Sequence, residues 1–203
     1  MIDRWLLPMQ ARALAPMAQA CVRAGMSADR ITITGFALGM LALPALATGL
    51  YGLALGLIVL NRIADGLDGA VARLTRPTDR GAYLDIALDF VFYAAVPLGF
   101  ALADPGTNAL PAAVLLAGFI GTGSSFLAFA TLSAKRGAPV TYPGKGIAYL
   151  GGLTEGAETI AAFVLMCLIP QAFAPIAWVF AAACAITTLA RWAAAWAAFA
   201  DPR

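Results

Sequence analysis

Long apolar stretches follow one another along most of this chain, and only short polar links separate them. Each stretch has about the 20 predominantly apolar residues that a helix needs to cross a bilayer. The pattern predicts six transmembrane helices, at residues 31–50, 51–74, 82–103, 109–132, 147–169 and 172–199. Because short links keep sequential helices adjacent, we expect an all-α, polytopic membrane protein. It forms a single domain over residues 1–203, with the six-helix bundle at 31–199.

The segment before the first predicted span, residues 1–28, has a different pattern. Apolar residues recur every four positions, at Trp5, Met9, Ala13, Met17 and Cys21, and the arginines lie off this stripe. Such an amphipathic pattern is typical of a helix that lies in the membrane interface. An irregular N-terminal arm is the alternative.

Composition supports a membrane protein and excludes several other classes. The 203 residues are 62% hydrophobic and 12% charged, whereas soluble domains have about 45–50% and about 25%. A formal net charge of +2 gives no basic surface for nucleic acid, so we expect no nucleic-acid partner. The absence of histidine excludes a histidine-based catalytic triad and a histidine-ligated metal.

Basic residues alternate between the two sides of the predicted bundle. Lys and Arg occur before the first span, in the second and fourth links and at the C-terminus, but not in the other three links. Basic residues concentrate in cytoplasmic loops. The pattern therefore predicts that both termini are cytoplasmic, and the composition suits a bacterial inner membrane.

Four aspartates lie in or beside the predicted second and third spans: Asp65, Asp68, Asp85 and Asp89. Four such groups would cost about 10 kcal/mol if they were deep in the bilayer and unpaired. The spacing within each pair is three or four residues, which places both members on one helix face. Because the two spans are antiparallel neighbours, all four carboxylates can converge near the cytoplasmic side.

Converging carboxylates need positive charge nearby. The two segments supply Arg62 and Arg73 as formal cations, and Arg62 lies one helical turn before the first aspartate. Carboxylate oxygens favour hard divalent ions, so we expect a metal site for Mg²⁺ or Mn²⁺, with two ions. The alternative is a set of surface carboxylates paired with nearby arginines.

These residues form two half-motifs within 25 residues. The first reads Asp65-Gly-Leu-Asp68-Gly69-Ala-Val-Ala72-Arg73, and the second reads Gly81-Ala-Tyr-Leu-Asp85-Ile-Ala-Leu-Asp89. The pattern resembles the signature of the CDP-alcohol phosphotransferases (CDP-alcohol phosphatidyltransferases), with all eight specified positions filled. Seven residues separate Arg73 from Gly81, one fewer than in most members.

The resemblance implies roles for the aspartates. Family members move a phosphatidyl or similar group from a CDP-linked donor to an alcohol and release CMP. Asp65, Asp68, Asp85 and Asp89 match the metal-binding carboxylates, and Asp89 also matches the proposed general base. Two metal ions can neutralise a phosphoryl group and align its nucleophile, and an attacking hydroxyl needs a proton acceptor within hydrogen-bond reach.

The resemblance also implies a site for the CDP moiety. The matching positions are Asp65, Gly69, Ala72, Arg73 and Gly81. A weaker match at the start of the first span adds Thr32 or Asp29. Asp29 also fits the N-cap of that helix.

The acceptor alcohol is not identified by these motifs. Lys135 and Arg136, with Lys145, could hold a phosphate, or they could be ordinary cytoplasmic basic residues. Glu155 and Glu158 lie in the predicted fifth span, where a carboxylate is a functional candidate. They could bind acceptor hydroxyls, or pair with an arginine of another helix.

We therefore expect an enzyme that moves a phosphatidyl group from CDP-diacylglycerol to a small polar alcohol in phospholipid biosynthesis, acting in the lipid bilayer. The resemblance implies a homodimer. Alternatives are a transferase that uses CDP-choline or CDP-ethanolamine, a different Mg²⁺-dependent lipid enzyme such as a prenyltransferase, and an ion-conducting protein.

Overall fold

The computed structural model describes residues 3–137 and 151–200, and no β-strand occurs in these two ranges. The all-α expectation is therefore confirmed for the described residues. Their helices are α1 (Asp3–Arg23), α2 (Ala28–Met40), α3 (Ala42–Ala47), α4 (Tyr51–Leu74), α5 (Asp79–Ala103), α6 (Pro105–Lys135), α7 (Gly156–Leu168), the short 3₁₀ helix η1 (Pro170–Ala172) and α8 (Phe173–Ala198).

Four helical segments of the described residues are long and apolar enough to cross a bilayer, as an integral membrane protein requires. They are Ala28–Ala47, Asp79–Ala103, Pro105–Lys135 and Pro170–Ala198. The helix α4 has 24 residues, but its second half carries the charged motif. The helix α7 has only 13 residues, whereas a span needs about 20. Six spans therefore remain a prediction.

Two helix starts differ from the sequence prediction. Residues 147–150 lie outside the described part of the chain, and α7 begins at Gly156 rather than near 147. Its start is fixed by a capping box, in which the side chains of Glu155 and Glu158 accept backbone N–H groups. The helix α2 begins at Ala28 with Ser27 as its N-cap, so Asp29 lies in the first turn instead.

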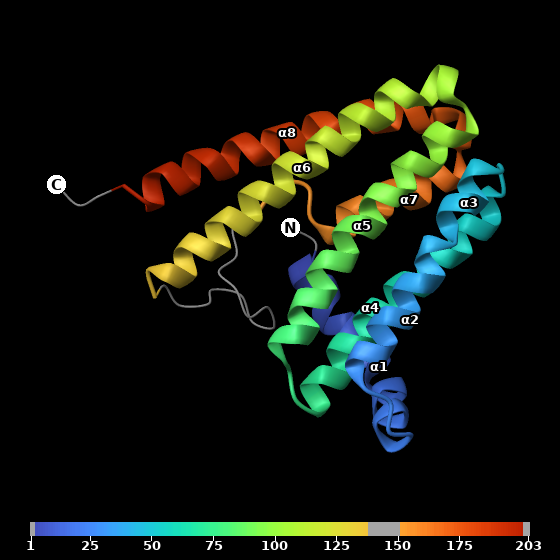
Figure 1. Cartoon of the computed structure of the whole chain (residues 1–203). Helices are drawn as coiled ribbons and strands as arrows, with labels where there is room; N and C mark the ends of the chain where they lie inside the picture. The colour runs from blue at the N-terminus through green and yellow to red at the C-terminus, as the bar shows by residue number, and fades with distance from the viewer. Residues whose placement is uncertain (1–2, 138–150, 201–203) are drawn as a thin grey trace.

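The first predicted span is interrupted at Leu41, where α2 ends and α3 begins. Pro44 follows within the next turn, and a proline has no N–H for the carbonyl four residues earlier. The missing hydrogen bond accounts for the break. The helix α3 still continues roughly in the direction of α2 (Figure 1).

Two groups of helices meet around a common apolar core. The long helices α6 and α8 lie side by side, and α5 connects them to the group formed by α2, α3 and α4 (Figure 1). Large side chains between the groups are fully buried, among them Phe92, Phe100, Phe163 and Phe173. Phe100 stacks on Phe173 at 4.5 Å between ring centroids. The core therefore holds α5 in position at the centre of the molecule.

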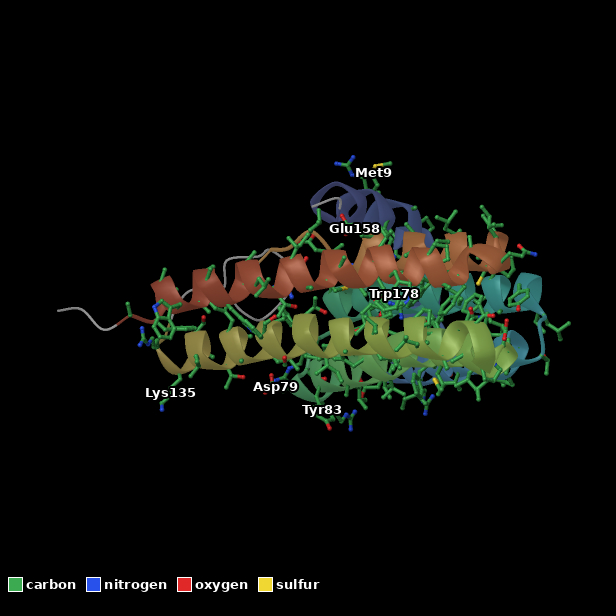
Figure 2. The ribbon with its side chains drawn as sticks, turned by 90° about the horizontal axis from the view of Figure 1, so that it is seen from above. Met9, Asp79, Tyr83, Lys135, Glu158 and Trp178 are labelled. Carbon is green, nitrogen blue, oxygen red and sulfur yellow. The ribbon has the colours of Figure 1, made fainter. Side chains whose placement is uncertain are left out.

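The N-terminal segment is helical, as predicted, and packs against α4. Leu14 and Ala18 are buried, whereas Met9 and Met17 from the apolar stripe are exposed. Figure 2 shows Met9 pointing outward from α1. An exposed methionine stripe suits contact with lipid, and the interfacial position of α1 remains a prediction.

Small residues let α2 approach α4 closely. A Cβ added at Gly35 would collide with the Cβ of Ala64, and one added at Gly39 would lie 2.7 Å from Nδ2 of Asn61. Glycine is therefore required at both positions for this spacing. The close approach brings the start of α2 against the charged half of α4.

Candidate functional site

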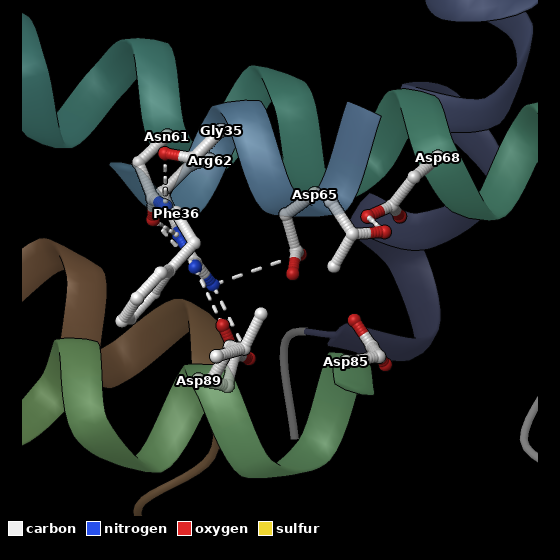
Figure 3. Close-up of a pocket in the computed structure, with 10 residues that line it drawn as sticks. Gly35, Phe36, Asn61, Arg62, Asp65, Asp68, Asp85 and Asp89 are labelled. Atoms are coloured by element: carbon white, nitrogen blue, oxygen red, sulfur yellow. Dashed lines mark hydrogen bonds and ion pairs between the residues drawn. The ribbon is translucent and has the colours of Figure 1, made fainter. Parts of the chain in front are cut away.

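The four motif aspartates line one pocket between α2, α4 and α5. Asp65 and Asp68 extend from α4, and Asp85 and Asp89 extend toward them from the antiparallel α5 (Figure 3). The predicted convergence of both pairs is therefore confirmed. The pocket also contains Thr32, Gly35 and Phe36 of α2, Asn61 and Arg62 of α4, and Leu88 of α5.

The four carboxylates differ in exposure and in partners. Asp68 is buried at 5% exposed, and its Oδ2 accepts a hydrogen bond of 2.5 Å from Oγ1 of Thr32. Asp65 and Asp89 are partly buried, and Asp85 is exposed. The pocket thus runs from a buried end at Asp68 to an open side at Asp85. Thr32, the weaker match in the sequence, lies within this site.

Arg62 is the cation that contacts the aspartates within the pocket. Its Nη2 lies 2.6 Å from Oδ1 of Asp89, and its Nη1 lies 3.4 Å from Oδ2 of the same residue. Nη1 also lies 3.6 Å from Oδ2 of Asp65. One guanidinium therefore bridges a carboxylate of α4 and a carboxylate of α5, as the dashed lines in Figure 3 indicate.

Side chains other than the aspartates also hold this guanidinium in place. The Oδ1 atom of Asn61 accepts hydrogen bonds from Nε and Nη2 of Arg62, at 2.8 and 2.6 Å. The carbon Cζ of Arg62 lies 4.8 Å from the ring centroid of Phe92 and 5.3 Å from that of Tyr93. Asn61 is itself buried and donates to the carbonyl of Gly35 at 3.0 Å. Arg62 is thereby tied to α2 as well as to α4 and α5.

The donor chemistry of the pocket suits a divalent ion. It presents carboxylate and hydroxyl oxygens without soft ligands among its lining residues, and hard ions such as Mg²⁺ and Mn²⁺ prefer oxygen. In the described ranges, however, no three acidic side chains are grouped tightly enough to hold an ion as they are placed.

Most residues matched to the CDP moiety lie in the last turns of α4 and the first turn of α5. A Cβ at Gly69 would lie 3.3 Å from Nη1 of Arg73, so the arginine passes over the glycine. Ala72 is partly buried in the same turn of helix. Gly81, in the first turn of α5, donates its N–H to Oγ1 of Thr78 at 3.0 Å. Among the predicted CDP residues, only Thr32 and Asp65 line the pocket itself.

A further ion pair joins this turn to α2. Nε of Arg80 donates to Oδ2 of Asp29 at 2.8 Å, and a Cβ at Gly81 would lie 3.3 Å from Oδ1 of Asp29. Asp29 thus lies beside Gly81, one of the predicted CDP residues, rather than at the N-cap of α2.

The family model for CDP-alcohol phosphatidyltransferases matches residues 26–200 of the chain. The chain belongs to the CDP-alcohol phosphatidyltransferase family. Within this match lie both half-motifs and every helix from α2 to α8. A curated relative, the inner membrane protein YnjF of Escherichia coli (strain K12), is 52% identical over 198 residues, which cover 94% of this chain and 93% of that protein.

Solved structures of a mycobacterial synthase have the same fold. One is the phosphatidylinositol phosphate synthase PgsA1 of Mycobacterium tuberculosis with CDP-DAG bound, with a TM-score of 0.77 and 22% identity, covering 95% of this chain and 99% of that chain. Another is the same synthase in complex with manganese and citrate, with a TM-score of 0.74 and 22% identity, covering 94% and 93%. At this identity the likeness establishes the fold.

The predicted acceptor residues lie apart from the residues that line the aspartate pocket. Glu155 and Glu158 form the capping box of α7. Arg136 donates to the carbonyl of Phe199 at 3.0 Å and lies 5.1 Å from its ring centroid, at the end of α8. Lys135 is exposed and extends outward from the end of α6 (Figure 2). Lys145 lies outside the described residues. A role in binding the acceptor alcohol stays a prediction for Lys135, Arg136, Glu155 and Glu158 of this chain.

Two residues outside the signature positions hold Arg62 beside Asp89. Asn61, which the sequence places with Arg62 one turn before the motif, accepts from the guanidinium, and so does the hydroxyl of Tyr93, which the sequence does not single out. Their periodicity gives one signal, because Asn61 lies four residues before Asp65, and Tyr93 four residues after Asp89. Each therefore shares a helix face with a motif aspartate.

Arg191 of α8 is one of the arginines with which the glutamates of the predicted fifth span could pair. It is buried at 6% exposed and donates from Nη1 to the carbonyl of Thr122 at 2.9 Å. It lines a second pocket between α6 and α8, together with Ser124, Ser125 and several apolar side chains. The buried guanidinium of Arg191 therefore connects α8 to α6.

Proposed function

We propose that this membrane protein transfers a phosphatidyl group from CDP-diacylglycerol to the hydroxyl of a small polar alcohol, with release of CMP. The observation that carries the proposal is the pocket in which Asp65 and Asp68 of α4 face Asp85 and Asp89 of α5. Family membership gives this pocket its chemistry. The solved synthase of the same fold has CDP-DAG bound, which supports the donor.

The four aspartates are the residues that would hold divalent Mg²⁺ or Mn²⁺ ions, two by our expectation. Ions bound there supply charge neutralisation at the phosphates and orientation for an in-line displacement. The manganese complex of the similar synthase supports this part of the proposal. The hydroxyl of Thr32 donates a hydrogen bond to Oδ2 of Asp68, which holds the Asp68 carboxylate in place at the buried end of the pocket.

Asp89 is the proposed general base. Its carboxylate accepts the proton of the acceptor hydroxyl as the oxygen attacks the β-phosphorus of the donor, and CMP leaves with the electron pair of the broken P–O bond. A base must lie within hydrogen-bond reach of the proton that it removes. The contacts from Arg62 fix Asp89 at the face of the pocket opposite Asp65, which meets the requirement for a positioned group.

Gly69, Ala72, Arg73 and Gly81 form the proposed surface for the CDP moiety. A guanidinium binds phosphate oxygens through charge-assisted hydrogen bonds, and Arg73 is exposed beside Gly69. The name of the curated relative supports a bacterial inner membrane as the location. A cytoplasmic active site and a homodimer complete the proposal.

The test is product formation by the purified full-length protein in lipid vesicles. CDP-diacylglycerol and Mn²⁺ are supplied with a panel of acceptors: glycerol 3-phosphate, inositol, inositol phosphate, serine, glycerol and phosphatidylglycerol. Mass spectrometry of the lipid fraction then identifies the product. We expect one new phospholipid whose formation requires both the donor and one acceptor.

The matched control replaces Asp68 by Asn, which keeps nearly the same side-chain volume and removes the charge. This variant should form no product. Product formation by Asp68→Asn at the rate of the unmodified protein would contradict the assignment of the pocket. Transfer that requires CDP-choline or CDP-ethanolamine and diacylglycerol would identify the other branch of donors.

A further inference from the structure

Arg62 is a cation that the chain places among its own catalytic carboxylates. Its guanidinium lies 2.6 Å from Asp89 and 3.6 Å from Asp65, the two aspartates that face each other across the pocket. The eight signature positions of the family do not include it. Its role is therefore separate from the roles that the motif implies.

The surroundings of Arg62 hold the guanidinium in place independently of the aspartates. Asn61 accepts two of its N–H groups, and Nη1 donates to the hydroxyl of Tyr93 at 3.3 Å. The rings of Phe92 and Tyr93 flank it, and aromatic faces attract cations. Loss of an aspartate contact would leave these contacts intact, so the cation stays beside the pocket when a ligand enters.

A fixed guanidinium has two consequences for the carboxylates. It orients Asp89 through two N–H groups, and two-point contacts of this kind define the plane of a carboxylate. It also places a permanent positive charge next to Asp65 and Asp89, since an arginine is not deprotonated in proteins. A divalent ion that uses these oxygens must share them with Arg62 and is repelled by it.

We infer that Arg62 is a positioning residue for Asp89 and a built-in competitor for the divalent ion, so that this chain binds its metal more weakly than the four carboxylates alone would. This inference adds a role for Arg62 to the proposed function. It rests on that function only where it predicts an effect on turnover. The effect on metal affinity follows from charge and distance and is measurable without any substrate.

The test compares Mn²⁺ binding to the purified full-length protein, titrated by electron paramagnetic resonance of the free ion. Arg62→Met removes the charge and keeps an unbranched apolar stem, and Arg62→Gln removes it while keeping a polar head for Asn61. Both should bind Mn²⁺ at least about tenfold more tightly, because a unit charge a few ångströms from the ion is removed. Arg62→Lys keeps the charge and should stay within about threefold of the unmodified protein.

The matched control is Arg23→Met, which removes an exposed arginine from the last turn of α1 that is not among the residues lining the pocket. It should leave both Mn²⁺ affinity and turnover unchanged. Turnover in Arg62→Met and Arg62→Gln should fall at least about tenfold at saturating Mn²⁺, since Asp89 loses its orientation. Arg62→Lys should recover part of that rate.

The results separate this inference from the proposed function. Equal or weaker Mn²⁺ binding in both neutral variants would overturn the competition, whatever the activity of the protein. Tighter binding in both variants, in a protein without any CDP-dependent transfer, would keep the competition and refute the proposed function instead. Unchanged turnover in the neutral variants of an active enzyme would overturn the positioning of Asp89.

Discussion

Replacing Gly39 by Ala tests whether the close approach of α2 to α4 sets the geometry of the site. The added Cβ would lie 2.7 Å from Nδ2, 2.8 Å from Cγ and 2.9 Å from Cβ of Asn61. Ordinary van der Waals contact begins at 3.4 Å. Because Asn61 is buried and bonded at both ends of its amide, the two helices must separate by about 0.7 Å to restore such contact.

That separation has a calculable cost. The hydrogen bond from Asn61 to the carbonyl of Gly35 is 3.0 Å long, and an additional 0.7 Å breaks it, at about 0.5–1.5 kcal/mol. Strain from overpacking adds about 1–3 kcal/mol, while the better helix propensity of alanine returns about 1 kcal/mol. We expect a net loss of about 0.5–3.5 kcal/mol in the free energy of unfolding. Turnover should fall about tenfold, because Asn61 also holds Arg62 beside Asp89.

The assay is thermal unfolding in detergent together with the rate of CMP release after reconstitution. The matched control is Gly56→Ala in α4, where an added Cβ would meet nothing within 4 Å. This control should be at least as stable as the unmodified protein, with a gain of up to about 1 kcal/mol from helix propensity, and equally active. A Gly39→Ala protein that matches Gly56→Ala in both measurements would refute the argument that this helix contact positions the site.

Three further changes test separate parts of the site. Thr32→Val keeps the side-chain shape but removes the hydroxyl that donates to Asp68; we expect a higher KM for the CDP donor with a smaller change in kcat, and unchanged KM would contradict a nucleotide-side role. Asp85→Asn should abolish turnover and weaken Mn²⁺ binding in the same titration, and full activity would contradict the metal assignment. Glu155→Ala removes one half of the α7 capping box and should lower stability by about 0.5–2 kcal/mol. Equal changes in both KM values would support that structural role, whereas a rise in the acceptor KM alone would support the predicted acceptor site.

The pairing of the aspartates could be predicted from the sequence because it depends on local geometry. Spacings of three and four residues place Asp65 beside Asp68, and Asp85 beside Asp89, on any regular helix. A short link between two helices then requires them to be antiparallel neighbours. The second predicted helix, 51–74, agrees with the observed α4 at both ends. Its helical pattern is local and uninterrupted between Leu50 and Thr75, which flank the helix.

The start of α7 could not be predicted from hydropathy. Residues 147–155 include Ile147, Ala148 and Leu150, so an apolar window continues through them. Besides the local capping box of Glu155 and Glu158, the residues before the observed start have long-range contacts: Oγ1 of Thr187 in α8 accepts the N–H groups of Leu153 and Thr154. These long-range bonds satisfy the backbone outside a helix, and no local pattern reports them.

The contact of Arg62 with Asp89 could not be predicted from the sequence around Arg62 alone. Its position one turn before Asp65 indicated a pairing within α4. Its shorter contact is to Asp89, which lies 27 residues further along the chain. The rotamer that reaches α5 is selected by Asn61, Phe92 and Tyr93 together, and their joint arrangement exists only in the packed structure.

The rate of CMP release from CDP-diacylglycerol tests the central claim most directly, namely that the four-aspartate pocket catalyses a metal-dependent transfer. It is measured in lipid vesicles with the acceptor panel, with Mn²⁺ or Mg²⁺ and after chelation, for the unmodified protein and for Asp89→Asn. The account predicts acceptor-dependent release that chelation abolishes, and an Asp89→Asn protein that binds the donor without turning it over. Release that persists at full rate in Asp89→Asn or after chelation would contradict it.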